Sequence, residues 1–567
     1  MSELGSQSLL RGWLREPIRT QMPIIRQSMI ATVLGNLLQL VSSLFVMAVY
    51  NKVIPNEALP TLVTLGIGVL VIVLFEFVFK WFRSVLSVDA CKSLEAVLMP
   101  LLFNKILAWD LQSRPKLSGS TAALVRDLES VVELFASSSI ATLVGIPFLL
   151  IYLMVVWVIG GPLVIITGIL VAIALGISVI YYLTVSRLME EAKRASIEKN
   201  SVFLEAVSHL ETLKSVGSYA FFTGRWENVL QKNEVIDIQL KHASQHVSNL
   251  QSTLSSVGQM VLVAVGAYLV IEGEITSGGL IAAVIINGRA MQPALQLANL
   301  LQRLSSAKTA LVRLNDVFDS MSSEELRRQN IRLTQIAPPI VIENLEFLPS
   351  GASAPTLQIS RLMIREGEHI GVVGSVGSGK STFAKLVAGV LTPTEGVIRY
   401  GSFDTSSIHQ TDLRRKVAFL GQTPGIFSGT VRDNICLDAP EISEDALLKV
   451  IQLSGLDAVL KSLPNGLSFV LSEGGRELSG GQKQILALAR AFASDPSVVV
   501  LDEPTSAMDP KHEQLFIRNM SKFIEGRLLI VVTHRKPILS VTKRILVIER
   551  GRIVMDGSRD EVLAKFS

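Results

Sequence analysis

The chain of 567 residues is too long for a single hydrophobic core, so at least two domains are expected. Hydrophobic residues make up 49% of it and the mean hydropathy is +0.44, which excludes an ordinary soluble protein and predicts a membrane portion. A net charge of +4 over this length does not indicate a nucleic-acid partner. The two cysteines, Cys91 and Cys436, are too far apart for a disulfide framework and suit a reducing compartment.

Residues 1–28 form a polar and basic N-terminal segment without the apolar core of a signal peptide, and we expect it to be cytoplasmic. Residues 29–318 contain six apolar segments, which predict a six-helix, all-α transmembrane domain. The second apolar segment, Thr61 to Phe79, would reach about 28 Å as a helix, which is enough to cross the hydrocarbon core. The predicted spans are Met29 to Val49, Thr61 to Phe79, Ile140 to Ile159, Leu163 to Leu183, Leu254 to Ile271 and Gly279 to Leu297.

The loops between these spans alternate between short and long. The long loops, Lys80 to Ser139 and Ser186 to Gln251, carry many Lys and Arg residues, whereas the short loops carry only Lys52. Because positively charged loops stay in the cytoplasm, we expect the long loops and both termini to be cytoplasmic. The protein is therefore predicted to be a multi-pass protein of a cell membrane.

Two sites inside the spans are charged. Glu76 and Lys80 are four residues apart near the end of the second span and are expected to form a local ion pair. Arg289 lies about 16 Å into the sixth span, where a charge is costly and usually faces a protein or water-filled interior. We expect Arg289 to face the central pathway; the alternative is that it bonds backbone groups freed near Pro293.

A second domain begins after a polar linker, residues 319–339, in which Ser322 to Glu325 has the composition of a helix start. Residues 340–567 alternate short apolar strands with helices, which predicts an α/β domain with a largely parallel sheet. The predicted strands are Val341 to Phe347, Ile370 to Val373, Val417 to Leu420, Val498 to Asp502, Leu528 to Thr533 and Ile545 to Ile548.

A phosphate-binding loop follows the second of these strands. Residues 374–381 match G-x-x-x-x-G-K-[ST], between an apolar strand and a predicted helix, as a P-loop requires. Its glycines allow the backbone to wrap a polyphosphate, while loop N–H groups and the helix N-terminus present positive charge. Lys380 is expected to reach the β- and γ-phosphates of ATP, and Ser381 to bind Mg²⁺. The predicted nucleotide-binding residues here are Gly374, Ser375, Gly377, Ser378, Gly379, Lys380, Ser381 and Thr382.

The strand Val498 to Asp502 ends in two acids at the edge of the sheet where ligands bind. Asp502 is placed to hold Mg²⁺, and Glu503 to polarise the water that attacks ATP. The segment 478–482, Leu-Ser-Gly-Gly-Gln, follows the phosphate loop and precedes this strand. It is another anion-binding helix start. Together the three motifs resemble those of ABC-type ATPases.

That resemblance implies roles for further residues. Gln422 matches the Q-loop glutamine, a Mg²⁺ ligand, and Asp509 closes a segment similar to the D-loop. His534 matches the switch histidine near the γ-phosphate and, with Glu503, is the predicted catalytic pair. In that family the signature residues complete the partner's site, which implies a homodimer. The predicted signature residues acting across the dimer are Ser479, Gly480, Gly481 and Gln482.

One part departs from the family pattern. An aromatic residue usually stacks on adenine just after the first strand of the domain. Here Phe347 comes slightly early and Leu348 stands near the expected place, so stacking on the base is not predicted.

The membrane half resembles the type I secretion ATPases, a group of half-size ABC exporters. The resemblance rests on Val49 to Asn56, Pro115 to Gly119, Asp127 to Glu129, Pro147-Phe148, Gly161 to Leu163, Gly279 to Ala283 and Gly288-Arg289. It implies ATP-driven export of a protein across the bacterial inner membrane, with a periplasmic adaptor and an outer-membrane channel as partners.

Within this resemblance, Gly145 stands where an acidic residue is expected. The segments Ala108 to Pro115 and Gly217 to Gly224 are our candidates for the coupling helices. The peptidase domain that some members carry is not expected here, because the residues before the first span include no Cys.

Two other functions remain open from sequence. The chain can instead export a lipid, a drug or a small peptide, since nothing in the spans excludes these cargoes. It can also be an ATP-gated channel or membrane regulator, although Glu503 and His534 favour a protein that hydrolyses ATP. The six spans exclude the soluble DNA-repair ATPases that share the signature motif.

Overall fold

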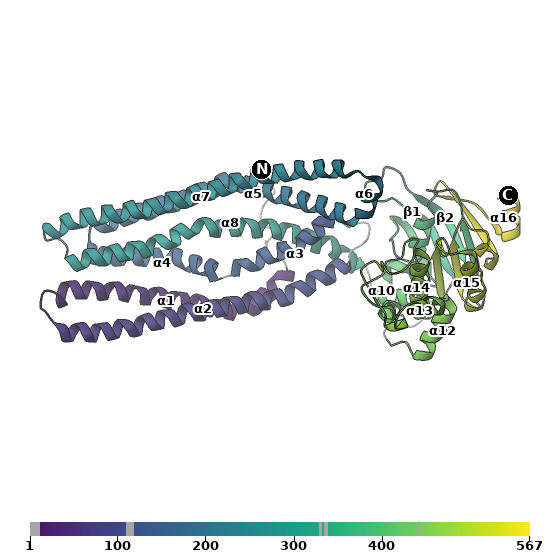
Figure 1. The fold of residues 1–567 in the computed structure, drawn as a ribbon, viewed down its shortest axis with the longest axis horizontal. Coiled ribbons are helices and arrows are strands. Elements are labelled where there is room, and N and C mark those ends of the chain that lie inside the picture. Colours follow the sequence, from purple (N-terminus) through teal and green to yellow (C-terminus); the bar gives the residue numbers. More distant parts are fainter. Residues whose placement is uncertain are drawn as a thin grey trace. The chain divides into compact units, whose positions relative to one another are not determined.

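The computed structural model describes residues 12–108, 118–135, 137–327, 331–333, 338–439 and 441–566. The described residues up to Ser320 form one compact unit and those from Met321 form a second. Figure 1 shows that the first unit is built of long helices and the second of sheets flanked by helices. Each unit is described by itself below.

The helical unit contains all six predicted spans, and most of its helices extend well beyond the apolar segments. The first span lies in α1 (Gly12–Ala48), which a π-helical turn (Val49–Val53) continues. Its helices after α1 are α2 (Leu59–Leu107), α3 (Ser118–Val132), α4 (Ser137–Gly160), α5 (Leu163–Ser208), α6 (Leu210–Val216), α7 (Tyr219–Ile271) and α8 (Ser277–Arg327).

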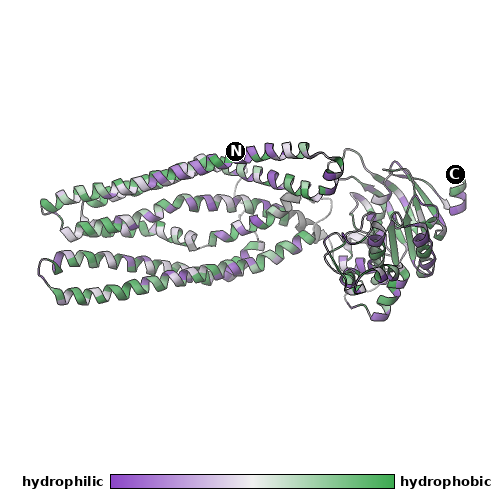
Figure 2. Cartoon of the chain, viewed as in Figure 1, coloured by the Kyte–Doolittle hydropathy of each residue, from purple (hydrophilic) through white to green (hydrophobic). Residues whose placement is uncertain are grey.

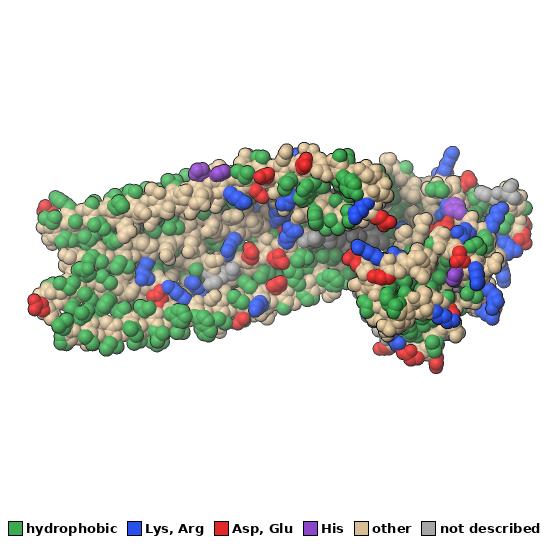
Figure 3. All heavy atoms as spheres, viewed as in Figure 1, with side chains coloured by type: hydrophobic (Ala, Val, Ile, Leu, Met, Phe, Trp, Pro, Cys, Tyr) green, Lys and Arg blue, Asp and Glu red, His purple; other side chains and the backbone are tan. Residues whose placement is uncertain are grey.

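Five of these helices, among the described residues, are long and apolar enough to cross a membrane: those containing the first five predicted spans. Helix α8 is not among them, because Asn287, Arg289 and Gln292 interrupt its apolar segment. Figure 2 shows the hydrophobic residues along these helices, and Figure 3 shows that charged side chains are more frequent on the part of the unit away from the α4–α5 turn. The sixth predicted span therefore lies in a helix, α8, that is apolar over part of the span and carries polar residues in the rest of it.

Apolar side chains from five helices form the core of this unit. Leu40 of α1, Tyr152 of α4, Leu170 of α5, Leu262 of α7 and Ile286 of α8 belong to one buried cluster. The helix break between α4 and α5 occurs where Gly161 has a φ of +49°, a conformation that glycine adopts without strain. The predicted Gly-Gly-Pro turn therefore lets α4 and α5 run back along each other.

Gly145 of α4 packs tightly against Pro293 of α8. A Cβ at Gly145 would lie 2.8 Å from Cγ of Pro293, closer than side chains pack. The proline ring is rigid and cannot rotate away. This contact leaves no room for the acidic side chain that the family resemblance predicts at this position.

The described part of the N-terminal segment, residues 12–28, is helical and continuous with the first span. Two predictions about the helical unit are wrong in detail. Ser322 to Glu325 does not start a helix, because α8 runs through it to Arg327. The second coupling segment, Gly217 to Gly224, is not a short helix: Gly217 (φ +69°) ends α6, and α7 begins at Tyr219.

The first coupling candidate, Ala108 to Pro115, lies outside the described residues apart from Ala108. Among the ion pairs predicted in the spans, Lys80 bonds Glu76 within α2 as expected. Cys91 and Cys436 are both free and half-buried.

The α/β unit is built around a six-stranded sheet in the order β12-β11-β3-β10-β9-β6. All neighbouring pairs are parallel except β11 with β12. Its strands are β3 (His369–Val373), β6 (Val417–Leu420), β9 (Val498–Asp502), β10 (Leu528–Val532), β11 (Arg544–Glu549) and β12 (Arg552–Ser558). The predicted parallel sheet is confirmed, although β12 was not predicted.

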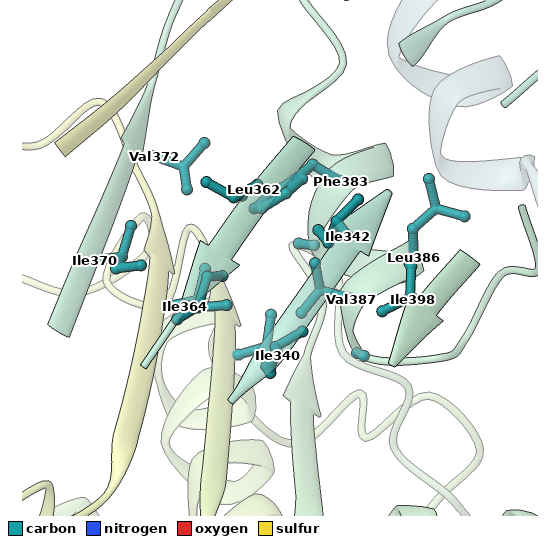
Figure 4. Packing of buried hydrophobic residues seen from close by; sticks show 14 of the residues in the cluster. Ile340, Ile342, Leu362, Ile364, Ile370, Val372, Phe383, Leu386, Val387 and Ile398 are labelled. Carbon is teal, nitrogen blue, oxygen red and sulfur yellow. The ribbon is translucent and has the colours of Figure 1, made fainter. Parts of the chain in front are cut away.

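The first predicted strand belongs to a different sheet. β1 (Ile340–Phe347) pairs antiparallel with β2 (Leu357–Ile364) and with β4 (Glu395–Tyr400), and β5 (Phe403–Asp404) completes the sheet. Figure 4 shows Ile342 of β1, Leu362 of β2 and Phe383 of the helix after the phosphate loop pointing toward one another. That helix is thus held between the two sheets, which fixes the loop at its start.

The remaining elements of this unit are shorter. A two-stranded ribbon pairs β7 (Gly429–Thr430) with β8 (Val470–Leu471). The helices are α9 (Lys380–Val387), α10 (Gln410–Lys416), α11 (Val431–Ile435), α12 (Glu444–Ser454), α13 (Leu456–Ser462), α14 (Gly480–Ala493), α15 (Pro510–Phe523) and α16 (Arg559–Phe566).

Candidate active site

The loop between β3 and α9 has the backbone that a phosphate cradle needs. Gly374, Gly377 and Gly379 have φ values of +152°, +79° and +101°. At Gly374 a Cβ would lie 2.0 Å from the carbonyl oxygen of Ile548. Only glycine fits there, so this loop conformation depends on the residues that the motif specifies.

Lys380 closes the loop on itself. Its Nζ donates to the carbonyl oxygens of Gly374 (2.9 Å) and Ser375 (2.7 Å), and the residue is 7% exposed. Burial lowers the pKa of this ammonium group, so an anion beside it would stabilise its charged form. The Oγ of Ser378 is buried and has no hydrogen-bond partner among the described residues. Both groups are thus available to phosphate oxygens at the N-terminus of α9.

Asp502 ends β9 beside Ser381. The Ser381 hydroxyl bonds the Asp502 carboxyl group, whose Oδ1 is buried and, within the part of the chain that the structure describes, has no partner. Burial raises the pKa of Asp502. An unpartnered carboxylate oxygen next to a hydroxyl is the kind of hard oxygen site that suits Mg²⁺ completed by phosphate and water. Among the described residues there is no group of three or more His, Cys, Asp or Glu that could hold a metal alone.

Glu503 adopts a strained backbone conformation at the end of the same strand. Its φ is +50°, although it is not glycine, and such strain collects at functional sites. Its N–H donates to the carbonyl oxygen of Val532 (2.8 Å) on the neighbouring strand β10. Its carboxylate accepts from the Thr533 hydroxyl (3.2 Å) and from the N–H of His534 (3.1 Å).

The sheet order explains why these side chains meet. β9 and β10 are parallel neighbours in which Asp502 pairs with Val532, so the residues after both strands lie at the same edge. The Nε2 atom of His534 lies 3.9 Å from Oε1 of Glu503. Gln422 follows β6, the neighbour of β9 on the other side, and is exposed. The sequence-predicted acids, histidine and glutamine therefore all follow strands that end at this edge.

The signature segment forms the N-terminal cap of α14. The hydroxyl of Ser479 accepts from the N–H of Gln482, while the Gln482 side chain accepts from the N–H of Ser479. This reciprocal cap fixes the turn while leaving Ser479 and Gly480 exposed. Among the described residues no hydrogen bond joins this cap to the phosphate loop. Asp509 similarly caps α15, accepting from the N–H groups of Lys511 and His512.

Sequence reasoning missed Gln484, which links this helix to Glu503. Gln484 is 2% exposed; its Nε2 donates to the carbonyl oxygen of Glu503 (2.7 Å), and its Oε1 accepts from the N–H of Ala507 (3.1 Å). Nothing in the sequence of the signature helix indicates that Gln484 makes a long-range hydrogen bond. The side chain positions the turn that carries Glu503.

A second missed group lies behind the same turn. Glu513 is 5% exposed and accepts from the Thr505 hydroxyl (2.6 Å) and from Arg535 (3.0 Å). Arg535 follows His534, so this buried network ties the histidine's strand end to the turn after Glu503. The only sequence signal was an acid inside an amphipathic helix, which is usually solvent-exposed.

No aromatic platform for adenine was predicted, and the buried position of Phe347 agrees with this. Phe347 is 4% exposed and belongs to the core between the two sheets, so its ring cannot stack on a base. Leu348, the next residue, is half-buried.

In the helical unit, Arg289 is half-buried and its Nη2 donates to the hydroxyl of Ser42 on α1 (3.0 Å). This partner differs from the alternative expected from sequence, in which Arg289 bonds backbone freed near Pro293. The arginine therefore bridges α8 and α1.

Comparison with known proteins places both units in context. The family model for the ABC transporter transmembrane region matches residues 25–292, and the ABC transporter model matches residues 357–506. The toxin RTX-I translocation ATP-binding protein of Actinobacillus pleuropneumoniae is 27% identical over 97% of this chain and 78% of its own length. The alpha-hemolysin translocation ATP-binding protein HlyB of Escherichia coli is 27% identical over 98% of this chain and 78% of its own length.

The fold also resembles a solved structure. A bacterial Atm1-family ABC exporter with ATP bound superimposes with a TM-score of 0.78, covering 98% of this chain and 97% of that one. At 18% identity this likeness describes the architecture alone.

Proposed function

Because the chain belongs to the ABC transporter family, as an ATPase that drives export, we propose that its cargo is a polypeptide. The proposal follows the named relatives, which translocate toxins and hemolysin. It places the chain in the bacterial inner membrane as the ATPase of a type I secretion system, with both termini in the cytoplasm. A periplasmic adaptor and an outer-membrane channel are the proposed partners.

The observation that supports a polypeptide cargo is a polar face along α8. Arg289, Gln292, Gln296, Asn299 and Arg303 follow one another at three- or four-residue intervals and so share one face of the helix. Gln292, Gln296 and Asn299 are exposed in the single chain. Arg289, Gln292 and Gln296 lie within the predicted span, which ends at Leu297, and polar residues in a span face protein or water rather than lipid. We therefore place this face on the pathway of the dimer.

A cavity of about 480 Å³ opens on the same face. It lies between the start of α4 and α8, where Thr142 donates to Gln296 (3.1 Å) and Arg303 donates to Ser138 (2.8 Å). Carboxamide side chains both donate and accept, as the peptide backbone does. Such a surface suits an extended polypeptide of any sequence, whereas the acyl chains of a lipid would leave these polar groups unpaired.

The proposed reaction is ATP hydrolysis at two sites shared by a homodimer. The phosphate loop, from Gly374 to Thr382, holds the phosphates of one ATP, and the partner's signature segment completes the site. Mg²⁺, when bound, neutralises phosphate charge, and its proposed ligands are Ser381, Gln422 and Asp502.

Within each site, Glu503 polarises the attacking water and His534 contacts the γ-phosphate. Asp509 lies in the turn that faces the partner. Closure of the dimer over two ATP molecules changes the helical units, and hydrolysis resets them.

Deleting the gene in its native bacterium tests the cargo. We expect at least one protein to disappear from the culture medium and to return with the wild-type gene but not with Glu503→Gln. An unchanged set of secreted proteins together with a changed lipid composition of the envelope would show that the cargo is a lipid. Loss of drug resistance alone would likewise contradict a polypeptide cargo.

The polar face has its own test. We expect single cysteines at Gln292, Gln296 and Asn299 in a Cys91→Ser, Cys436→Ser background to react with a water-soluble thiol reagent. Cysteines at Leu150 and Val158, exposed apolar positions on α4, serve as matched controls and should stay protected by lipid. Protection of all three polar positions in every nucleotide state would refute a water-filled pathway along α8.

A further inference from the structure

We propose that a cavity between α5 and α8 binds the phosphate headgroup of an anionic membrane lipid. The cavity has a volume of about 630 Å³ and lies within the helical unit. This ligand goes beyond the proposed export function, although its placement uses the cytoplasmic orientation proposed above.

Five cations line the cavity, and two of them share an ion pair with one buried carboxylate. Asp127 of α3 is 1% exposed, and its Oδ1 accepts from Lys193 (2.8 Å) and Arg313 (3.1 Å). Asp127 thus fixes α3, α5 and α8 around one buried carboxylate. Its two partners form a rigid wall rather than free binding groups.

The other three cations are free to bind an anion. Within the described part of the chain, no ion pair neutralises Arg187, Arg194 or Lys308, and the only acid in the lining is Glu190. Arg187 and Arg194 are seven residues apart, so they lie two turns apart on the same face of α5. Lys308 approaches from α8. The cavity therefore carries a net positive charge and attracts one phosphate group.

The uncharged part of the lining mixes hydroxyl-bearing and apolar side chains, and it begins at the membrane boundary. Tyr182 lies at the end of the apolar run of α5, and Arg187 lies four residues beyond Leu183, about 6 Å further along the helix. Tyrosine and arginine in this order are typical of the lipid headgroup layer. Met189, Ile197 and Val312 supply apolar surface between the cations.

Cations beside apolar side chains favour an amphiphilic ligand. A free phosphate ion would bind the cations but leave the apolar surface of Met189, Ile197 and Val312 in water, whereas a lipid with a phosphate headgroup would cover both. Basic pockets between helices on the cytoplasmic side bind such headgroups, and each cation near the surface strengthens binding about fivefold.

Native mass spectrometry of the full-length dimer tests the site. The protein would be released from nanodiscs made of equal parts phosphatidylglycerol and phosphatidylcholine, and retained lipids counted. We expect phosphatidylglycerol to be enriched, and the triple variant Arg187→Gln, Arg194→Gln, Lys308→Gln to lose that enrichment at least tenfold. The matched control, Lys232→Gln, Lys241→Gln, Lys522→Gln, removes three exposed lysines elsewhere and should retain it.

Two further arms separate the outcomes. Arg187→Lys keeps the charge and should retain phosphatidylglycerol, whereas Arg187→Gln should lose about fivefold, which separates loss of charge from misfolding. Retention by the triple variant equal to wild type would overturn the site. Phosphate retained in place of phosphatidylglycerol when inorganic phosphate is added would show a free-anion site and overturn the lipid.

Discussion

At the residue scale, the most informative position is Glu503. Its left-handed backbone is held by bonds to Val532, Thr533, His534 and Gln484, all from other parts of the chain. Because this strain requires support, the acid's orientation is determined by its surroundings rather than by its own preference. The carboxylate rests against the end of β10, where it accepts two hydrogen bonds.

Replacing Glu503 by Gln should abolish turnover without preventing ATP binding. The amide is isosteric but cannot accept a proton from water, and general-base catalysis contributes about 10²- to 10⁴-fold. We expect ATPase activity to fall by at least about 10²-fold while ATP still raises the melting temperature. Near-normal phosphate release by the purified full-length variant would contradict the assigned role.

Asp502 should make ATP binding sensitive to pH. Burial raises its pKa, so as pH falls this carboxyl group takes up a proton before an ordinary aspartate does. Since Mg²⁺ requires the ionised carboxylate, the MgATP-induced rise in melting temperature should shrink from a pH above the usual aspartate range downward. In Asp502→Asn this rise should be small at every pH.

The same variant should stabilise the nucleotide-free protein near neutral pH. Because the pKa of Asp502 is higher in the folded than in the unfolded protein, ionisation of this carboxyl group lowers the free energy of unfolding as pH rises through these values. Asp502→Asn removes the charge and therefore this loss of stability. We expect a melting temperature equal to or above wild type without nucleotide. A clear decrease at pH 7, in thermal unfolding of the full-length protein, would contradict this sign.

At the element scale, the helical spans were predictable and much of the antiparallel sheet was not. Long apolar runs predict spans regardless of their neighbours, and the parallel strands are continuous apolar runs. β2 contains Arg361 and β4 begins with Glu395-Gly396, so neither shows a clean pattern. Their strand structure depends on pairing with β1, which the residues of neither strand reveal by themselves.

The contact between α4 and α8 makes a prediction at this scale. Gly145→Ala should destabilise the protein by about 1–3 kcal/mol, because a Cβ would overlap the ring of Pro293. Gly176→Ala, where nothing lies within 4 Å, is the control and should be neutral or slightly stabilising. Melting temperatures of purified protein measure both.

Pro293→Ala should partly rescue Gly145→Ala, because it removes the Cγ atom that a Cβ at Gly145 would meet at 2.8 Å but keeps the Cβ atom at 3.0 Å. A double variant no more stable than Gly145→Ala would show that the loss arises elsewhere.

At the scale of the whole molecule, the proposed homodimer gives each chain one half of each of two ATP sites. The phosphate loop, Asp502, Glu503 and His534 are gathered at one edge of the sheet, whereas the Ser479 cap is exposed and, among the described residues, has no hydrogen bond to them. The motifs were predictable because each is local in sequence. The links through Gln484 and Glu513 were not, because they join residues that only the fold brings together.

Mixed dimers test the sharing of sites. Lys380→Ala disables the phosphate loop and Ser479→Arg disables the signature, so each homodimer should fail to trap ATP. A heterodimer of the two variants contains one intact phosphate loop facing one intact signature, and it should trap about one ATP per dimer. Separately tagged chains allow its purification. Absence of trapping in the heterodimer, with normal trapping by wild type, would show that the signature acts within its own chain.

Gln484 gives this arrangement a further consequence. In the proposed dimer, the helix that presents Ser479 to the partner's ATP also holds, through Gln484, the carbonyl oxygen of Glu503 in its own chain. Any shift of that helix on meeting the partner's nucleotide therefore reaches the chain's own acid. The two halves are therefore constrained to evolve together. A substitution in this helix that changes how a chain completes its partner's site would also change how Glu503 is held in the chain's own site.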